Sequence, residues 1–246
     1  VLALSASLLV GCSSGTASSV PVSASSAAES TVSSVEETAS SAVDENEAAA
    51  AQLLNDLTGS YQELWPVILA DEYKQTWLDD CTALVGEDNA EAAFEKLSSM
   101  VTGDVYGEDA VEAYANGGGA YFCGFTNSLA TLTFDGETST ISGTDKDGNV
   151  LFSHTYHYIG MEPVRGLYEF QSDDADSGEF TYFFLAPDTS AETYHIEFRY
   201  GSDAEALSQY DTGEYAYWLA SGISTDCDQT MIDNCIELFC TENLAG

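Results

Sequence analysis

One of the three histidines in this 246-residue chain has a carboxylate two positions away. His195 and Glu197 lie in a segment whose alternating pattern predicts a β-strand, and residues i and i+2 of a strand project from the same face. An imidazole and a carboxylate a few ångströms apart are suitable ligands for a divalent cation. His195 and Glu197 are therefore the candidate metal ligands. The alternative is a hydrogen-bonded histidine, with Glu197 paired to Arg165 or Arg199.

His154 and His157 lie on another expected strand and are kept as additional candidate ligands. Their spacing of three puts them on opposite faces, so at most one can point inward. The alternative for each is a solvated or hydrogen-bonded side chain. The nearby segment 145–149 resembles the start of a calcium loop, but it lies between strands and lacks the later glutamate, so a hairpin turn is favoured.

The remaining chemistry-bearing residues are cysteines. Five follow Cys12, an odd number, and the sequence does not fix their pairing. They are Cys81, Cys123, Cys227, Cys235 and Cys240. No Cys-x-x-Cys spacing, Ser–His–acid set, phosphate-binding loop or dinucleotide motif is present, so we expect a protein that is not an enzyme.

The charge of the chain excludes one class of partner. There are 42 acidic and 5 basic residues, which give a net charge of -37. A surface this negative repels phosphate backbones, so we expect no nucleic-acid binding. Anionic membranes are repelled as well, and any attachment must come from a lipid or an apolar segment. The same field favours cations.

The first 50 residues differ from the rest in composition. Residues 1–12 resemble the apolar end of a signal peptide, and Leu9-Val-Gly-Cys12 matches a bacterial lipobox in which Cys12 would be lipidated. Residues 13–50 contain 12 serines, 9 alanines and no aromatic residue, which predicts a disordered tether. The alternative is a short helix near residues 45–54. The folded domain is expected over residues 51–246. It would lie outside the cytoplasm and be attached to the bacterial cell membrane through the lipid alone.

Within that domain, apolar residues at helical spacing predict helices between residues 53 and 115, and a final helix is expected over 228–239. Strands separated by turn residues are expected between the helical parts. They are 120–126, 129–134, 139–143, 150–159, 165–171, 179–185 and 193–200. The predicted fold class is therefore β-rich α+β, an antiparallel meander closing into a barrel.

Several stretches of the domain resemble the ZinT (YodA-type) family of bacterial extracytoplasmic zinc-binding proteins. The matching stretches are 57–66, 164–170, 185–187 and 195–201, followed by 204–207. Their order and spacing agree over most of residues 57–239. The resemblance implies a lipocalin/calycin-like barrel with N-terminal helices and a C-terminal helix.

The resemblance also implies a zinc site of three histidines, two in a His-x-His on a late strand and one on the preceding strand. By position the pair falls on His195 and Glu197, and the third falls on Phe183 or its neighbour. One ligand is thus kept, one is replaced by a carboxylate that favours harder cations, and one is lost.

The expected function is zinc or other divalent-metal binding that assists zinc acquisition. The metal would pass to the solute-binding protein of a zinc ABC transporter. The alternative is a non-catalytic binding module with a degenerate metal site. Its barrel mouth would hold a small organic ligand against Tyr156, Tyr168, Phe183 and Tyr194.

Overall fold

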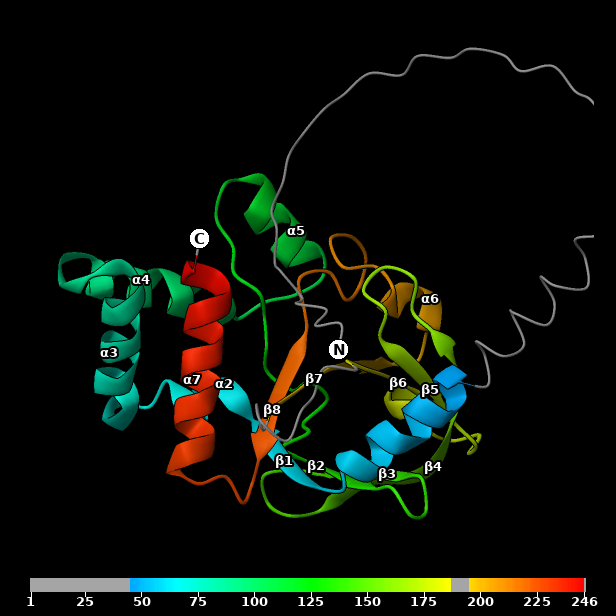
Figure 1. The fold of residues 1–246 in the computed structure, drawn as a ribbon. Helices are drawn as coiled ribbons and strands as arrows, with labels where there is room; N and C mark the ends of the chain where they lie inside the picture. Colours follow the sequence, from blue (N-terminus) through cyan, green and yellow to red (C-terminus); the bar gives the residue numbers. More distant parts are fainter. Residues whose placement is uncertain (1–44, 187–194, 246) are drawn as a thin grey trace, which may run out of the picture.

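Eight antiparallel strands close into a barrel in the computed structural model, which describes residues 45–186 and 195–245 (Figure 1). Each strand pairs with its neighbours in sequence order, and β8 returns to β1. The strands are β1 (Gly59–Glu63), β2 (Thr131–Asp135), β3 (Thr140–Thr144), β4 (Val150–Met161), β5 (Tyr168–Ser172), β6 (Tyr182–Leu185), β7 (His195–Gly201) and β8 (Ala220–Ser224). The predicted antiparallel barrel is confirmed.

Aromatic rings fill the barrel interior. Strand register places Phe183 opposite Phe170 on one side and Tyr200 on the other, and all three are at most 1% exposed. The Phe183 and Tyr200 rings stack at 5.3 Å, and Trp218 meets Tyr200 edge-on at 5.1 Å. Burial of such rings contributes both apolar area and ring–ring attraction to stability.

Residues that were expected to line an open barrel mouth are instead packed in the barrel core. Tyr156 and Phe183, two of the residues expected to contact an organic ligand, are core residues with 2% and 0% exposure. The Tyr156 hydroxyl donates to the Phe180 carbonyl. Tyr168 is half-buried against this core, and Tyr194 lies outside the described residues.

A layer of helices lies beside β1 and β8 (Figure 1). The helical elements after β1 are α2 (Leu64–Ile68), η1 (Asp71–Tyr73), α3 (Lys74–Val85), α4 (Glu87–Val101), α5 (Glu108–Ala115), η2 (Gly178–Phe180), α6 (Ala204–Leu207) and α7 (Gln229–Leu244). The layer itself consists of α2, α3, α4 and α7, and within it α3 packs against both α4 and α7. The fully buried Trp77 anchors it, and its Nε1 donates to the Ile68 carbonyl at 2.7 Å. Over the described residues, none of the helices has the length and apolar character to cross a membrane.

A further helix over residues 45–56 precedes β1. Its Ala50, Leu53 and Leu54 are buried and join the barrel core. Residues 45–50, predicted as the end of the tether, belong to this helix, so the short helix given as the alternative near residues 45–54 is present. Residues 1–44, with the predicted signal peptide, Cys12 and most of the predicted tether, lie outside the described residues.

The sequence patterns missed two strands and overextended others. Residues 59–63 continue a helical spacing of apolar residues but form β1, where only Tyr61 is buried. β8 is made of small residues, and an added Cβ at Gly222 would lie 3.0 Å from Ile196 Cγ1. Residues 120–126, predicted as a strand, make only isolated bridges at Phe122. The strand predicted over 179–185 begins at Tyr182, after η2.

Like charges meet where α3 faces α7. Asp80 of α3 has a buried Oδ2 with no hydrogen-bond partner among the described residues. Partial burial raises the pKa of Asp80, and the carboxylates of Glu237, Asp233 and Asp79 raise it further. The folded state therefore holds the Asp80 proton more tightly than the unfolded state does, and ionisation of Asp80 above its folded pKa destabilises the fold.

Because Asp80 is partly exposed, solvent screens some of the repulsion from its neighbours. We therefore expect Asp80→Asn to stabilise the protein at pH 7 by about 0.5–1 kcal/mol. The gain should shrink as the pH falls through the raised folded pKa and vanish below the unfolded value. Urea unfolding at several pH values measures this. Asp147→Asn, at an exposed carboxylate in the turn between β3 and β4, is the control and should change little. Equal gains in both variants would contradict the expectation.

Candidate metal site and the adjoining pocket

His195 and Glu197 share the outer face of β7. The residues between and after them, Ile196 and Phe198, belong to the barrel core, so the alternate positions point away from it. Cross-strand pairing sets His195 opposite Ile223 and Glu197 opposite Ser221 on β8. Both candidate ligands are half-buried. An imidazole and a carboxylate thus stand on one face, next to the helical layer in which Ile223 is buried.

The same register decides where a third ligand from β6 would stand. Phe183 is opposite Tyr200 and points into the barrel, whereas Phe184 is opposite Arg199 and shares the outer face with Glu197. Phe183 therefore faces away from His195, and of its two neighbours on the outward face, Tyr182 and Phe184, Phe184 lies nearer to Glu197. Its ring is 0% exposed and supplies no metal donor.

Arg199, the next residue on this face, is fully buried. Its guanidinium donates to the carbonyls of Leu207, Gln209 and Tyr215, with the Gln209 contact at 3.1 Å. It also lies 4.4 Å from the centre of the Tyr210 ring, a cation–π distance. Burial lowers the pKa of Arg199 to about 10, so it stays charged at neutral pH. This face therefore carries two half-buried candidate metal ligands, His195 and Glu197. Beside them, the buried guanidinium of Arg199 holds the loop after β7 in place.

His154 and His157 lie on β4, which is not a neighbour of β7 in the barrel. His154 shares the inward face of Phe152 and Tyr156, and its Nδ1 lies 2.8 Å from Asp174 Oδ2. His157 points outward, with its Nδ1 2.7 Å from Asp173 Oδ1. An ionised aspartate can only accept, so each imidazole donates through Nδ1.

The structure does not bring these two histidines to His195 and Glu197. In residues 45–186 and 195–245, no group of three or more His, Cys, Asp or Glu side chains could hold a metal ion. Two donors on β7 therefore fit a divalent cation as part of a ligand set, short of the three or four protein ligands usual for zinc.

The calcium-like segment is a hairpin turn, as predicted. Asp145 accepts hydrogen bonds from the main-chain N–H groups of Asp147 and Asn149, each at 2.9 Å. The Asn149 amide and main chain lower the pKa of Asp145. Its carboxylate is thus engaged by the turn itself.

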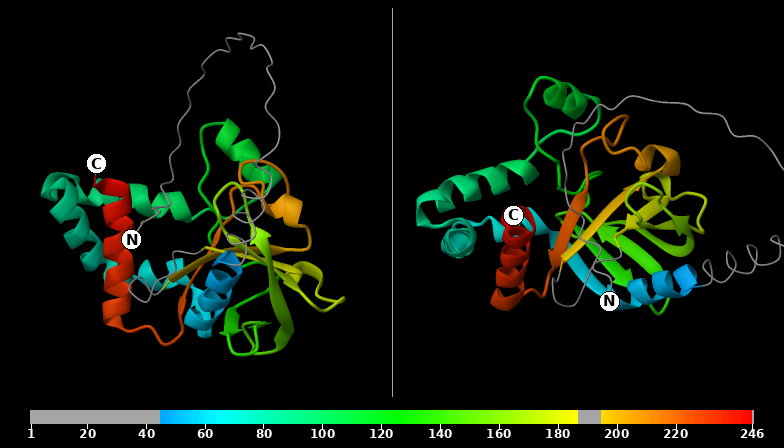
Figure 2. Two further views of the ribbon diagram at one scale, coloured as in Figure 1. Left: turned by 45° about the vertical axis from the view of Figure 1, so that its right-hand side comes forward. Right: turned by 45° about the horizontal axis from the view of Figure 1, so that its top comes forward.

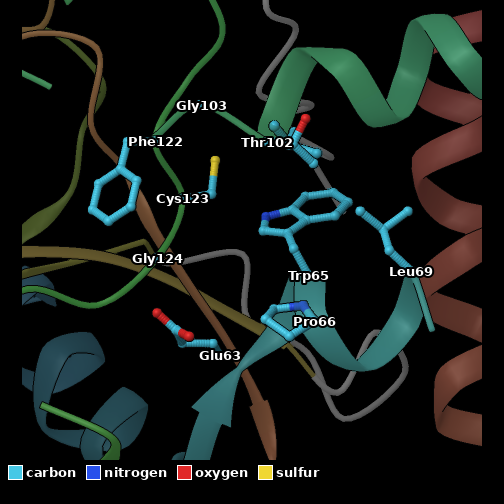
Figure 3. Close-up of a pocket in the computed structure, with 10 residues that line it drawn as sticks. Glu63, Trp65, Pro66, Leu69, Thr102, Gly103, Phe122, Cys123 and Gly124 are labelled. Atoms are coloured by element: carbon cyan, nitrogen blue, oxygen red, sulfur yellow. The ribbon is translucent and has the colours of Figure 1, made fainter. Parts of the chain in front are cut away.

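A pocket of about 320 Å³ opens between the barrel and the helical layer (Figure 3). Glu63 at the end of β1, Trp65 of α2, Thr102 after α4, and Phe122 and Cys123 line it. Glu63 Oε1 accepts the Phe125 N–H at 2.6 Å. The Trp65 Nε1 is buried and finds no acceptor among the described residues. Sequence reasoning missed this site because its residues come from three separate stretches of the chain.

Cys123 joins the pocket to the candidate metal face. Burial raises the pKa of the Cys123 thiol strongly, and the negative charge of Glu197 raises it further. The side chains of Trp65 and Ser221 and the positive charge of Arg165 lower it by smaller amounts. The thiol is therefore protonated at neutral pH and is a poor nucleophile. The arrangement can bind a ligand or a cation, but it does not present an activated nucleophile at this position.

The described strands thus define a closed antiparallel barrel of the lipocalin/calycin-like class with a helical layer. No protein-family model matches the sequence, and no curated protein matches it. Among solved structures the chain is similar to the Zn(II)-bound ZinT-like domain of Streptococcus pneumoniae AdcA, at 15% identity and a TM-score of 0.47, covering 75% of this chain and 89% of that domain. It is also similar to Zn(II)-bound AdcA from the same organism, at 14% identity and a TM-score of 0.45, covering 75% of this chain and 35% of that one.

Proposed function

We propose that this protein binds a divalent cation, zinc first among them, through His195 and Glu197, and that it assists zinc acquisition without catalysing a reaction. The observation that carries the proposal is the placement of an imidazole and a carboxylate at i and i+2 on one half-buried strand face. Zinc is the metal to test first because the similar solved structures are Zn(II)-bound.

The proposed setting is the outside of a bacterial cell. Cys12 would carry a lipid, and residues 13–44 would hold the barrel away from the membrane. The net charge of -37 supports capture, because a negative field raises the local concentration of cations. We propose delivery of the captured metal to the solute-binding protein of a zinc ABC transporter.

Removal of the imidazole tests the site. His195→Ala should weaken zinc binding at least about tenfold, because one of two donors on the face is lost. Isothermal titration of zinc into the full chain at pH 7 measures the change.

His157→Ala is the matched control, since it removes an exposed imidazole from β4. Its zinc affinity should equal that of the unaltered chain. Unchanged binding in His195→Ala, or a loss in His157→Ala in its place, would overturn the assignment.

The second candidate function is binding of a small organic ligand. It is favoured by the pocket at Trp65 and Cys123, where a buried indole N–H has no acceptor among the described residues. A ligand with a hydrogen-bond acceptor and an apolar body would satisfy that donor beside Phe122. Metal analysis and native mass spectrometry of the chain as purified separate the two functions. Bound zinc supports the first, and a metal-free chain carrying an organic molecule supports the second.

A further inference from the structure

Two buried thiols meet where the helices α3 and α7 pack together. Cys81 of α3 and Cys240 of α7 have their Sγ atoms 3.9 Å apart, and both residues are 0% exposed. The two views in Figure 2 show α3 and α7 side by side, and the same helices pack against each other along their length. The thiols thus lie about 2 Å beyond the length of an S–S bond, a gap that small side-chain rotations can close.

We propose that Cys81 and Cys240 form a disulfide that fastens α3 to the C-terminal helix. The oxidant is an external disulfide. One cysteine thiolate attacks it to give a mixed disulfide and release one thiol, and the second cysteine then displaces the other thiol. Two protein thiols and one external disulfide thus become one protein disulfide and two external thiols, and their two protons pass to the thiols released.

Geometry selects this pair from the five cysteines that follow Cys12. Cys235 and Cys240 are five residues apart on α7, a rise of about 7.5 Å that separates them along the helix. Cys123 lies in the pocket beside Trp65, with its thiol 3.9 Å from the Tyr121 carbonyl. Cys227 precedes α7 and is half-buried. The thiol contact that joins two separate helices is that of Cys81 with Cys240.

The burial of both residues indicates when the bond forms. Desolvation raises the pKa of Cys81 and of Cys240, so very little thiolate exists in the folded chain at neutral pH. An external disulfide also has no route to two side chains with no exposed surface. The bond therefore forms during folding, before α3 and α7 close over the thiols.

The cross-link would act on the part of the helical layer that borders the pocket. It joins positions 159 residues apart, and closure of a loop this long greatly restricts the unfolded chain. Near it, Phe239 of α7 packs against Trp65 at 4.8 Å and against Trp77 at 6.1 Å. The disulfide would hold Phe239 against Trp65, whose other side lines the pocket.

Refolding the full chain with oxidised and reduced glutathione tests the proposal. Proteolysis without reductant, followed by mass spectrometry, should give a linked peptide containing Cys81 and Cys240, about 2 Da lighter than the sum of its parts. Chain that is refolded and melted in reductant, so that the cross-link never forms, should melt roughly 5–15 °C below the oxidised chain.

Cys81→Ala should abolish this effect of reductant, whereas Cys235→Ala, at another buried cysteine of α7, should retain it. Recovery of Cys81 and Cys240 as free thiols from correctly refolded, unaltered chain would overturn the proposal even if a variant fails to fold. Zinc titration with and without reductant is scored separately, so failure of the metal site and failure of the disulfide are distinguishable.

Discussion

Arg199→Met should lower the free energy of unfolding by about 3–5 kcal/mol, the largest stability loss we expect from a change outside the barrel interior. The substitution removes the donors to three main-chain carbonyls, those of Leu207, Gln209 and Tyr215. Two of these bonds are fully buried, so water cannot replace the lost donor. The guanidinium face that packs on Tyr210 is lost as well.

Denaturant unfolding of the full chain measures the loss. Lys146→Met, which removes an exposed cation from the hairpin turn after β3, is the control and should stay within about 0.5 kcal/mol of the unaltered chain. Arg199→Lys should recover less than half of the difference, because an ammonium cannot donate to three carbonyls in the fork geometry of a guanidinium. A loss below about 1 kcal/mol for Arg199→Met would show that the loop beyond β7 is held by other contacts.

The sequence could not predict which way the face of β7 that carries Arg199 points. Alternation along residues 195–200 predicts a strand and puts His195 and Glu197 on one face, which the register shows. The same alternation says nothing of whether that face points into the barrel. Only the pairing with β6 and β8 settles this, and it turns His195, Glu197 and Arg199 outward.

The fold was predictable where the alternation of buried and exposed positions was clear. The twelve residues of β4 alternate between exposed and buried positions, and the strand was expected within two residues of its observed end. β1 and β8 were not predictable, because neither alternates between more and less buried positions as β2 and β3 of the same length do. Their strand state comes from pairing with each other and with β2 and β7, contacts distant in sequence.

The pocket and the cysteine pair were hidden for the same reason. Glu63, Trp65 and Cys123 have ordinary neighbours in the sequence and meet only after the barrel closes. Five cysteines allow many pairings, and the contact of Cys81 with Cys240 depends on how α3 and α7 pack. In contrast, the net charge of -37 needs no fold to predict attraction of cations.

Phe183→His tests which face of β6 belongs to the metal site. This change restores a histidine at the position that the family resemblance names first, yet its ring would enter the aromatic core between Phe170 and Tyr200. We expect a loss of about 2–4 kcal/mol in the free energy of unfolding, from lost apolar contacts and an imidazole without solvent. Zinc affinity should not increase, because the new side chain points away from His195 and Glu197.

The dependence of stability on pH below neutral distinguishes the cost of burying an imidazole from the cost of leaving a cavity. A buried imidazole must stay neutral in the folded state, so the stability loss in Phe183→His should grow as the pH falls below about 6.5. Phe183→Leu, which leaves a smaller side chain with nothing to titrate, should show a pH-independent loss. If Phe183→His bound zinc more tightly than the unaltered chain, the metal would have to lie inside the barrel, and the outward face of β7 could not be its site.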